Sequence, residues 1–89
     1  DAISFRKDML RIHDYKSGAI PAHIEQLEIY AALFCLEYRV KPTDIETELR
    51  IYQSDDILCH NPTADDISAI MNKIIVSDKI IKKIKERES

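Results

Sequence analysis

Hydrophobic and polar residues alternate with two different periods along this chain. In the first sixteen residues the alternation is close to every second position, over residues 1–6 and 9–16, which is typical of β-strands. Lys7 and Asp8 lie between these segments and predict a tight polar turn, although neither is the glycine that such turns favour. We therefore expect the chain to begin with a β-hairpin.

The length of this turn decides which residues face each other in the hairpin. With a two-residue loop, residue 6 faces residue 9, and continuing the ladder brings Asp1 opposite Asp14 with Cβ atoms about 5 Å apart. Two facing carboxylates repel each other unless a cation lies between them. A loop of another length would shift this register.

From residue 21 onward the hydrophobic period becomes helical. It predicts an amphipathic helix over residues 21–38, with Pro21 in its first turn and Lys41-Pro42 ending it. The apolar stripe of this helix comprises Ile24, Leu27, Tyr30, Ala31 and Phe34.

The second half of the chain predicts further strands and one more helix. A third strand is expected at residues 46–53 and a short fourth strand at residues 57–60. Thr63 and Asp66 have the spacing of a capping box at the start of the last helix. The apolar stripe of that helix comprises Ile67, Ile70, Met71, Ile74, Ile81 and Ile84. The order β-β-α-β-(β)-α predicts a single α+β domain over residues 1–89, a mixed sandwich of sheet and helices.

Composition narrows the class of protein. The 89 residues are 45% hydrophobic and 33% charged with a net charge of -3, which excludes a disordered chain and a uniformly basic nucleic-acid-binding protein. There is no apolar stretch of about 18 residues and no signal peptide, so we expect a cytoplasmic protein without a membrane segment. Cys35 and Cys59 form no CxxC motif; we expect reduced thiols, with Cys35 in the core.

The residues that suggest chemistry lie near the end of the predicted hairpin. Asp14 and Lys16 are two apart on a strand and therefore point to the same side, whereas His13 points to the other. A carboxylate beside an ammonium group, with a second carboxylate nearby, suits metal-assisted phosphodiester hydrolysis. Gln26 and Tyr30 share one helix face. The alternatives are an exposed ion pair at a strand end for Asp14 and Lys16, and a half-buried helix face for Gln26 and Tyr30. For Asp1 the alternative is a frayed terminus.

The segment Asp14-Tyr15-Lys16-Ser17-Gly18, with an upstream aspartate and a following Gln26-x-x-x-Tyr30 helix motif, resembles the PD-(D/E)XK nuclease superfamily. It is most similar to the RecB/AddB-like branch, which includes phage and CRISPR-associated exonucleases. The motifs cover residues 1–38, and the element order extends the resemblance further. The resemblance implies a restriction-endonuclease-like core and a metal-dependent DNA nuclease, in DNA recombination, repair, phage replication or defence.

The resemblance also implies a role for each residue of the motif. Asp1 and Asp14 are expected to bind Mg²⁺ or Mn²⁺, with the main-chain carbonyl of Tyr15 as a further metal ligand. Lys16 is expected to be the catalytic lysine, which orients the water and stabilises the phosphate in the transition state. Gln26 and Tyr30 are expected to line the site and to hold Lys16 or the DNA backbone.

The chain also departs from the family. The family's first core helix is missing, so residues 1–89 are expected to be the C-terminal part of a nuclease core. Some members of this branch bind an iron-sulfur cluster through four cysteines, and two cysteines cannot, so no cluster is expected. The alternative function is a non-catalytic DNA- or protein-binding or assembly module that retains the fold.

The remaining charged residues receive simpler interpretations. The basic segment 79–87 fits a solvated helix face, a DNA-binding patch, or a surface for a protein partner or oligomer. His60 is expected in a loop. His23 is expected in solvent, with contact to a phosphate as the alternative. The carboxylates of Glu25, Glu28 and Glu37 are expected to be solvent-face charges.

Overall fold

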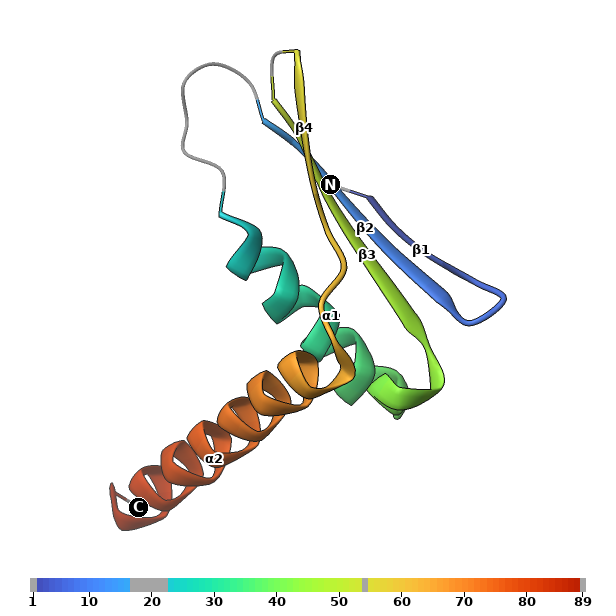
Figure 1. Cartoon of the computed structure of the whole chain (residues 1–89). Coiled ribbons are helices and arrows are strands. Elements are labelled where there is room, and N and C mark those ends of the chain that lie inside the picture. The colour runs from blue at the N-terminus through green and yellow to red at the C-terminus, as the bar shows by residue number, and fades with distance from the viewer. Residues whose placement is uncertain (1, 17–22, 54, 89) are drawn as a thin grey trace.

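The computed structural model describes residues 2–16, 23–53 and 55–88. One four-stranded sheet carries the helix α1 on one face, and α2 packs against α1 and then continues away from the sheet (Figure 1). The strands are β1 (Ala2–Arg6), β2 (Met9–Lys16), β3 (Glu46–Gln53) and β4 (Asp56–His60); the helices are α1 (Ile24–Tyr38), the short 3₁₀ helix η1 (Pro42–Asp44) and α2 (Ala64–Glu88). The predicted α+β class and the order of elements are confirmed.

The sheet is mixed, with strand order β1-β2-β3-β4. Its two outer pairs are antiparallel hairpins, and the central pair, β2 and β3, is parallel. A parallel pair needs a long connection. The helix α1, which follows β2 and precedes β3 in the sequence, provides it by running back along one face of the sheet (Figure 1). The carboxyl ends of β2 and β3 consequently meet at the same end of the sheet.

The first hairpin has the register predicted from a two-residue turn. Arg6 pairs with Met9 and Ala2 pairs with His13. Lys7 and Asp8 have φ angles of 49° and 63°, so both turn residues adopt the left-handed conformation without a glycine. The main-chain carbonyl of Asp8 also accepts a hydrogen bond of 2.8 Å from the N–H of Glu46, which ties the turn to the start of β3.

The core lies between the sheet and the helices. Alternate residues of β2 and β3 face α1, because side chains change sides at every step along a strand. α2 contributes Ile67 to the same core. The buried apolar residues are Leu10, Ile12, Leu27, Ala31, Ala32, Cys35, Leu49, Ile51 and Ile67. The predicted core position of Cys35 is confirmed, and burial raises the pKa of its thiol.

The end of α1 and the start of α2 each have a local structural feature that explains the boundary. The helix α1 ends at Tyr38, where Arg39 takes the left-handed conformation with φ 55°, and Pro42 then starts η1. At the start of α2 the predicted capping box is confirmed. The N–H of Thr63 donates to Oδ2 of Asp66, and the N–H of Asp66 donates to Oγ1 of Thr63, both at 3.1 Å. Among the described helices, none has the length and apolar character needed to cross a membrane.

Candidate functional site

Asp14 and Lys16 lie at the carboxyl end of β2, on the side of the sheet that faces α1. Asp14 continues the row that contains Leu10 and Ile12, and it is buried with 5% of its surface exposed. Oδ2 of Asp14 and Nζ of Lys16 are 3.0 Å apart. The ion pair is therefore not the fully exposed one that a simple strand end would give, because the carboxylate is buried.

A buried carboxylate needs compensation for the water that it loses. Lys16 supplies a positive charge from the same strand, and its side chain stays 27% exposed. In the parallel pair, Asp14 lies beside Ile51 and Lys16 lies beside Gln53. The carboxyl ends of parallel strands are the usual position of ligand sites in open sheets that carry helices, so the location suits a functional pair.

The other expected metal ligands are Asp1 and the main-chain carbonyl of Tyr15. Asp1 lies outside the described residues, so the predicted pair of Asp1 with Asp14 stays a prediction, although the register beside it is the expected one. The side chain of Tyr15 points to the opposite face of the sheet and is 64% exposed. The expected ligand was its main-chain carbonyl, and this also stays a prediction.

Gln26 and Tyr30 contact each other on α1. Nε2 of Gln26 donates a hydrogen bond of 3.0 Å to the hydroxyl of Tyr30, and Tyr30 packs against the core. Among the described residues, no hydrogen bond or ion pair joins them to Asp14 or Lys16. Their expected role beside the lysine stays a prediction, and the structure gives them a contact of their own.

A second cluster of possible metal ligands lies between α1, the end of β4 and the start of α2. One ligand atom each from Glu28, His60 and Asp66 lies within 4.8 Å of the others, and Oε2 of Glu28 is 4.0 Å from Nε2 of His60. Two expectations are corrected here. His60 is the last residue of β4 rather than a loop residue, and Glu28 is only 16% exposed because it packs beside His60.

This cluster could not be recognised from the sequence, because Glu28 is far along the chain from the other two residues. His60 and Asp66 are six positions apart without a metal-binding spacing. Carboxylates and an imidazole can together bind Zn²⁺ or Mn²⁺. Asp66 already caps α2, however, and the positive end of the helix dipole disfavours a cation at this position. Asp14 and Lys16 therefore remain the stronger candidate.

The open face of the sheet carries an aromatic and charged cluster. The rings of Tyr15 and Tyr52 stack with centroids 4.9 Å apart, and His13 meets Tyr52 edge-on at 5.7 Å. Nη1 of Arg50 donates to the hydroxyl of Tyr52 at 3.3 Å, and its Nε pairs with Oε1 of Glu48 at 2.7 Å. The hydrogen bond to Tyr52, followed by the charge of Glu48, raises the pKa of Arg50. The prediction that the side chain of His13 lies on the other face of the sheet from Asp14 is confirmed.

Comparison with known proteins finds no matching family model, curated protein or solved structure. The geometry of the chain's own residues is therefore the basis for a functional proposal.

Proposed function

We propose that this chain is part of a metal-dependent nuclease core in which Asp14 and Lys16 are the central residues of the active site. The observation that carries the proposal is the ion pair at the carboxyl end of β2, with Oδ2 and Nζ 3.0 Å apart and the carboxylate 7% exposed. A charged pair in this position costs desolvation, and a catalytic role explains why the sequence places it there.

The donor chemistry of the pair fits the proposed metal. Mg²⁺ and Mn²⁺ prefer carboxylate and carbonyl oxygens, and Asp14 offers a buried carboxylate on β2. In this proposal Asp14 holds the ion, with Asp1 and the carbonyl of Tyr15 as further ligands. The bound ion supplies charge stabilisation at the phosphate and activation of water.

Lys16 has a separate role in the proposal. Its ammonium group lies at the rim, 27% exposed, while its partner carboxylate is buried. A cation in that position can donate hydrogen bonds to a non-bridging phosphate oxygen or to the attacking water. Gln26 and Tyr30 then position the substrate from α1. The substrate class is a phosphodiester, with DNA as the expected nucleic acid.

The test is cleavage of a labelled DNA with Mn²⁺ present, comparing the parent with Lys16→Met. This change removes the ammonium group and keeps most of the aliphatic stem, and we expect about a 100-fold loss of rate. Lys73→Met, on the α1–α2 side of the molecule, is the matched control and should keep the parent rate. Equal rates for Lys16→Met and the parent would refute the catalytic role.

A second candidate function is a non-catalytic binding or assembly module with the same fold. The observation that favours it is the exposure of large apolar side chains on α2, including Ile80 and Ile81 at 54% and 51%. Exposed apolar surface of this kind often marks an interaction site. A chain that binds DNA or a protein partner but neither binds Mn²⁺ through Asp14 nor cleaves DNA would support this function.

A further inference from the structure

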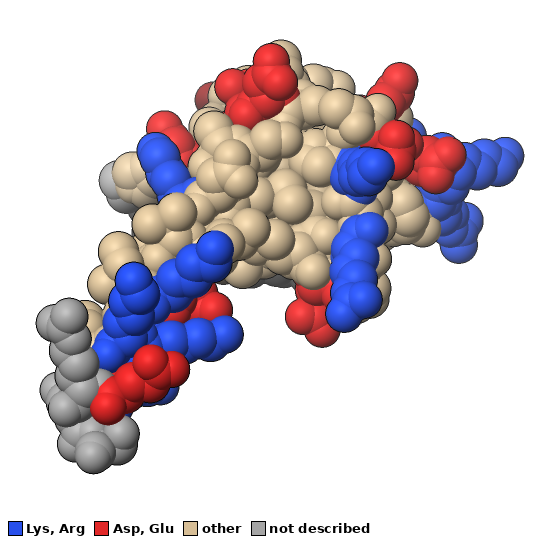
Figure 2. Space-filling model, turned by 90° about the horizontal axis from the view of Figure 1, so that it is seen from below, with Lys and Arg blue, Asp and Glu red and all other residues tan. Residues whose placement is uncertain are grey.

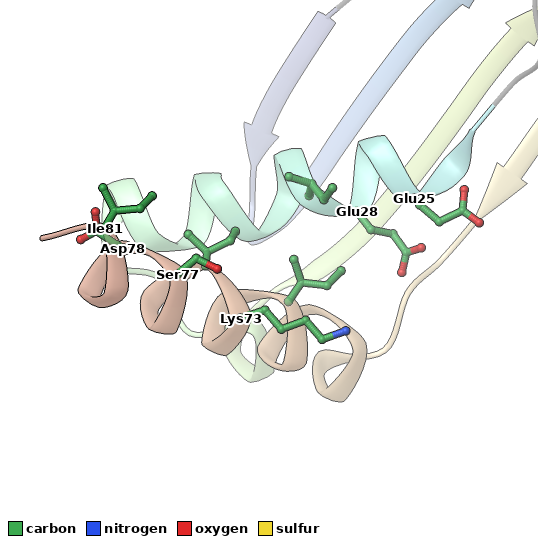
Figure 3. Close-up of a pocket in the computed structure, with 9 residues that line it drawn as sticks. Glu25, Glu28, Lys73, Ser77, Asp78 and Ile81 are labelled. Atoms are coloured by element: carbon green, nitrogen blue, oxygen red, sulfur yellow. The ribbon is translucent and has the colours of Figure 1, made fainter. Parts of the chain in front are cut away.

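A groove of about 590 Å³ runs between α1 and the middle of α2. Its apolar lining comes from Ile29 of α1 and from Ile70, Ile74 and Ile81 of α2. Figure 3 shows Glu25 and Glu28 at one end of this groove, and Asp78 and Ile81 at the other. The groove is thus apolar along its length. The end where α1 begins carries the carboxylates of Glu25 and Glu28 and the ammonium group of Lys73, and the other end carries the carboxylate of Asp78.

One stripe of α2 both lines the groove and extends beyond it. Its residues are spaced alternately by three and four positions, the a/d pattern of helices that pack side by side. The stripe comprises Ile67, Ile70, Ile74, Ser77, Ile81 and Ile84. Its first residue, Ile67, is 1% exposed in the core, whereas Ile81 and Ile84 are each 51% exposed. The packing surface of α2 therefore continues past the point where this chain itself covers it.

The charges of the molecule are arranged along the same axis. Asp65 and Asp66 begin α2, and Glu25 and Glu28 lie at the acidic end of the groove. Lysines gather on the distal part of α2 (Figure 2); they are Lys79, Lys82, Lys83 and Lys85. The end of the groove where α1 begins has two carboxylates against one lysine, Lys73. The distal part of α2 has these four lysines against the carboxylates of Asp78 and Glu86.

We propose that the groove binds the distal half of α2 from a second copy of this chain, with the two α2 helices antiparallel. In this arrangement Ile81 and Ile84 of each copy enter the groove of the other. Lys85 flanks the stripe and comes to the end where the other copy carries Glu25 and Glu28. A single surface then provides both the ridge and the groove, as a twofold symmetric interface requires.

The antiparallel direction follows from the charges. A parallel pair would place the lysine clusters of both copies side by side, and like charges at that distance repel. The antiparallel pair brings each basic end beside an acidic end, and it also opposes the two helix dipoles. This inference does not rest on the proposed nuclease function, because it concerns association and not cleavage.

The first test is sedimentation of the parent chain over a wide range of concentration. We expect a reversible monomer–dimer equilibrium. The variant Ile81→Glu, which places a charge in the stripe, should weaken dimerisation at least about tenfold, corresponding to about 1.4 kcal/mol. Val76→Glu is the matched control, since Val76 is 54% exposed on the same helix but away from the stripe. It should dimerise like the parent.

Circular dichroism keeps this test interpretable, because both variants change exposed residues and should retain the parent spectrum. A parent that stays monomeric at every concentration overturns the proposal and leaves the groove to a helix from another protein. Equal weakening by Ile81→Glu and Val76→Glu also overturns it, since the stripe would then not be the interface.

Orientation is tested by carbodiimide cross-linking of a mixture of isotope-labelled and unlabelled chains. Antiparallel packing predicts links between chains that join Lys85 or Lys82 to Glu25 or Glu28. The antiparallel arrangement would be contradicted if the only links between chains joined Glu86 of one copy to the distal lysines of the other copy. Lys85→Gln should remove the Lys85 links while the Ile81 contact preserves the dimer.

Discussion

Nζ of Lys16 lies 3.0 Å from Oδ2 of Asp14, yet only 7% of the Asp14 side chain is exposed against 27% of the Lys16 side chain. The two residues thus meet at the border between the core and solvent. The carboxylate depends on the ammonium group for compensation, because burial removes most of its contact with water. The same position leaves the lysine partly accessible to solvent.

This dependence predicts an energetic coupling between the two residues. Lys16→Met should lower the free energy of unfolding by about 1–2 kcal/mol, because it leaves a buried charge without its partner. The combined change with Asp14→Asn should cost less than the sum of the single changes, with a coupling of about 1 kcal/mol. Urea denaturation of the four proteins in the cycle measures it.

The exposed pair of Lys82 and Asp78 is the matched control for that cycle. Its atoms are 3.2 Å apart, but the side chains are 71% and 60% exposed. Such a helix pair should couple by at most about 0.5 kcal/mol. A coupling of Asp14 with Lys16 as small as that of the control would contradict the account of a buried ion pair.

The core of the sheet predicts a large effect of cavity formation. Leu49 is 0% exposed at the centre of β3, so Leu49→Ala should lower the free energy of unfolding by about 2–5 kcal/mol. Ile57→Ala on β4 is the comparison, because Ile57 is 61% exposed, and its cost should stay below about 1 kcal/mol. Chemical denaturation measures the free energy of unfolding of both variants. A similar loss in Leu49→Ala and Ile57→Ala would contradict the placement of Leu49 in the core.

Loss of the capping box should destabilise the protein less than a cavity in the core does. Thr63→Ala removes the hydroxyl that accepts from the N–H of Asp66 at 3.1 Å, and about 1 kcal/mol of stability should be lost. Thr63→Ser keeps the hydroxyl and should keep most of the stability. Thermal unfolding followed by circular dichroism gives both values, and an unchanged midpoint for Thr63→Ala would argue against this helix start.

The two cysteines should differ in reactivity with a thiol reagent. Cys59 is exposed, whereas Cys35 is buried and its thiol pKa is raised by that burial. The reactive species is the thiolate, so Cys59 should react in the folded protein and Cys35 only after unfolding. Equal rates for the two thiols in the folded state would contradict the placement of Cys35.

The raised pKa of Cys35 also predicts a dependence of stability on pH. The unfolded chain loses this proton near the ordinary thiol pKa of about 8.5, while the folded protein retains it. The folded state then binds more protons, so stability should fall as pH rises above that value. Cys35→Ala should flatten this part of the profile, measured by urea denaturation at several pH values.

Much of the local structure was predictable from the sequence because local patterns determine it. The strands Met9–Lys16 and Glu46–Gln53 have the predicted bounds, since period-2 alternation is a property of the strand itself. The two-residue turn at Lys7 and Asp8 and the Thr63 capping box are equally local. The helix Ile24–Tyr38 ends as predicted but does not include His23, which has an extended backbone and forms the N-cap of the helix. Positions 21 and 22 of the predicted range lie outside the described residues.

What the sequence did not reveal depends on contacts between distant segments. Alternation along β2 alone cannot show that β2 pairs in parallel with β3 or that Asp14 is buried. Glu28 and His60 approach each other only because α1 and β4 converge near the start of α2. The spacing of Gln26 and Tyr30 predicted a shared helix face, and the structure adds the hydrogen bond between them. Their relation to Lys16 depends on how α1 packs on the sheet.

In the proposed site Asp14 holds a divalent metal, and Mn²⁺ titration by calorimetry tests this most directly. The parent, Asp14→Asn and His60→Gln should be compared, because Glu28, His60 and Asp66 form another group of potential ligands. We predict binding by the parent and by His60→Gln, and loss of binding in Asp14→Asn. Binding that survives in Asp14→Asn but disappears in His60→Gln, or no binding by the parent, would contradict the account.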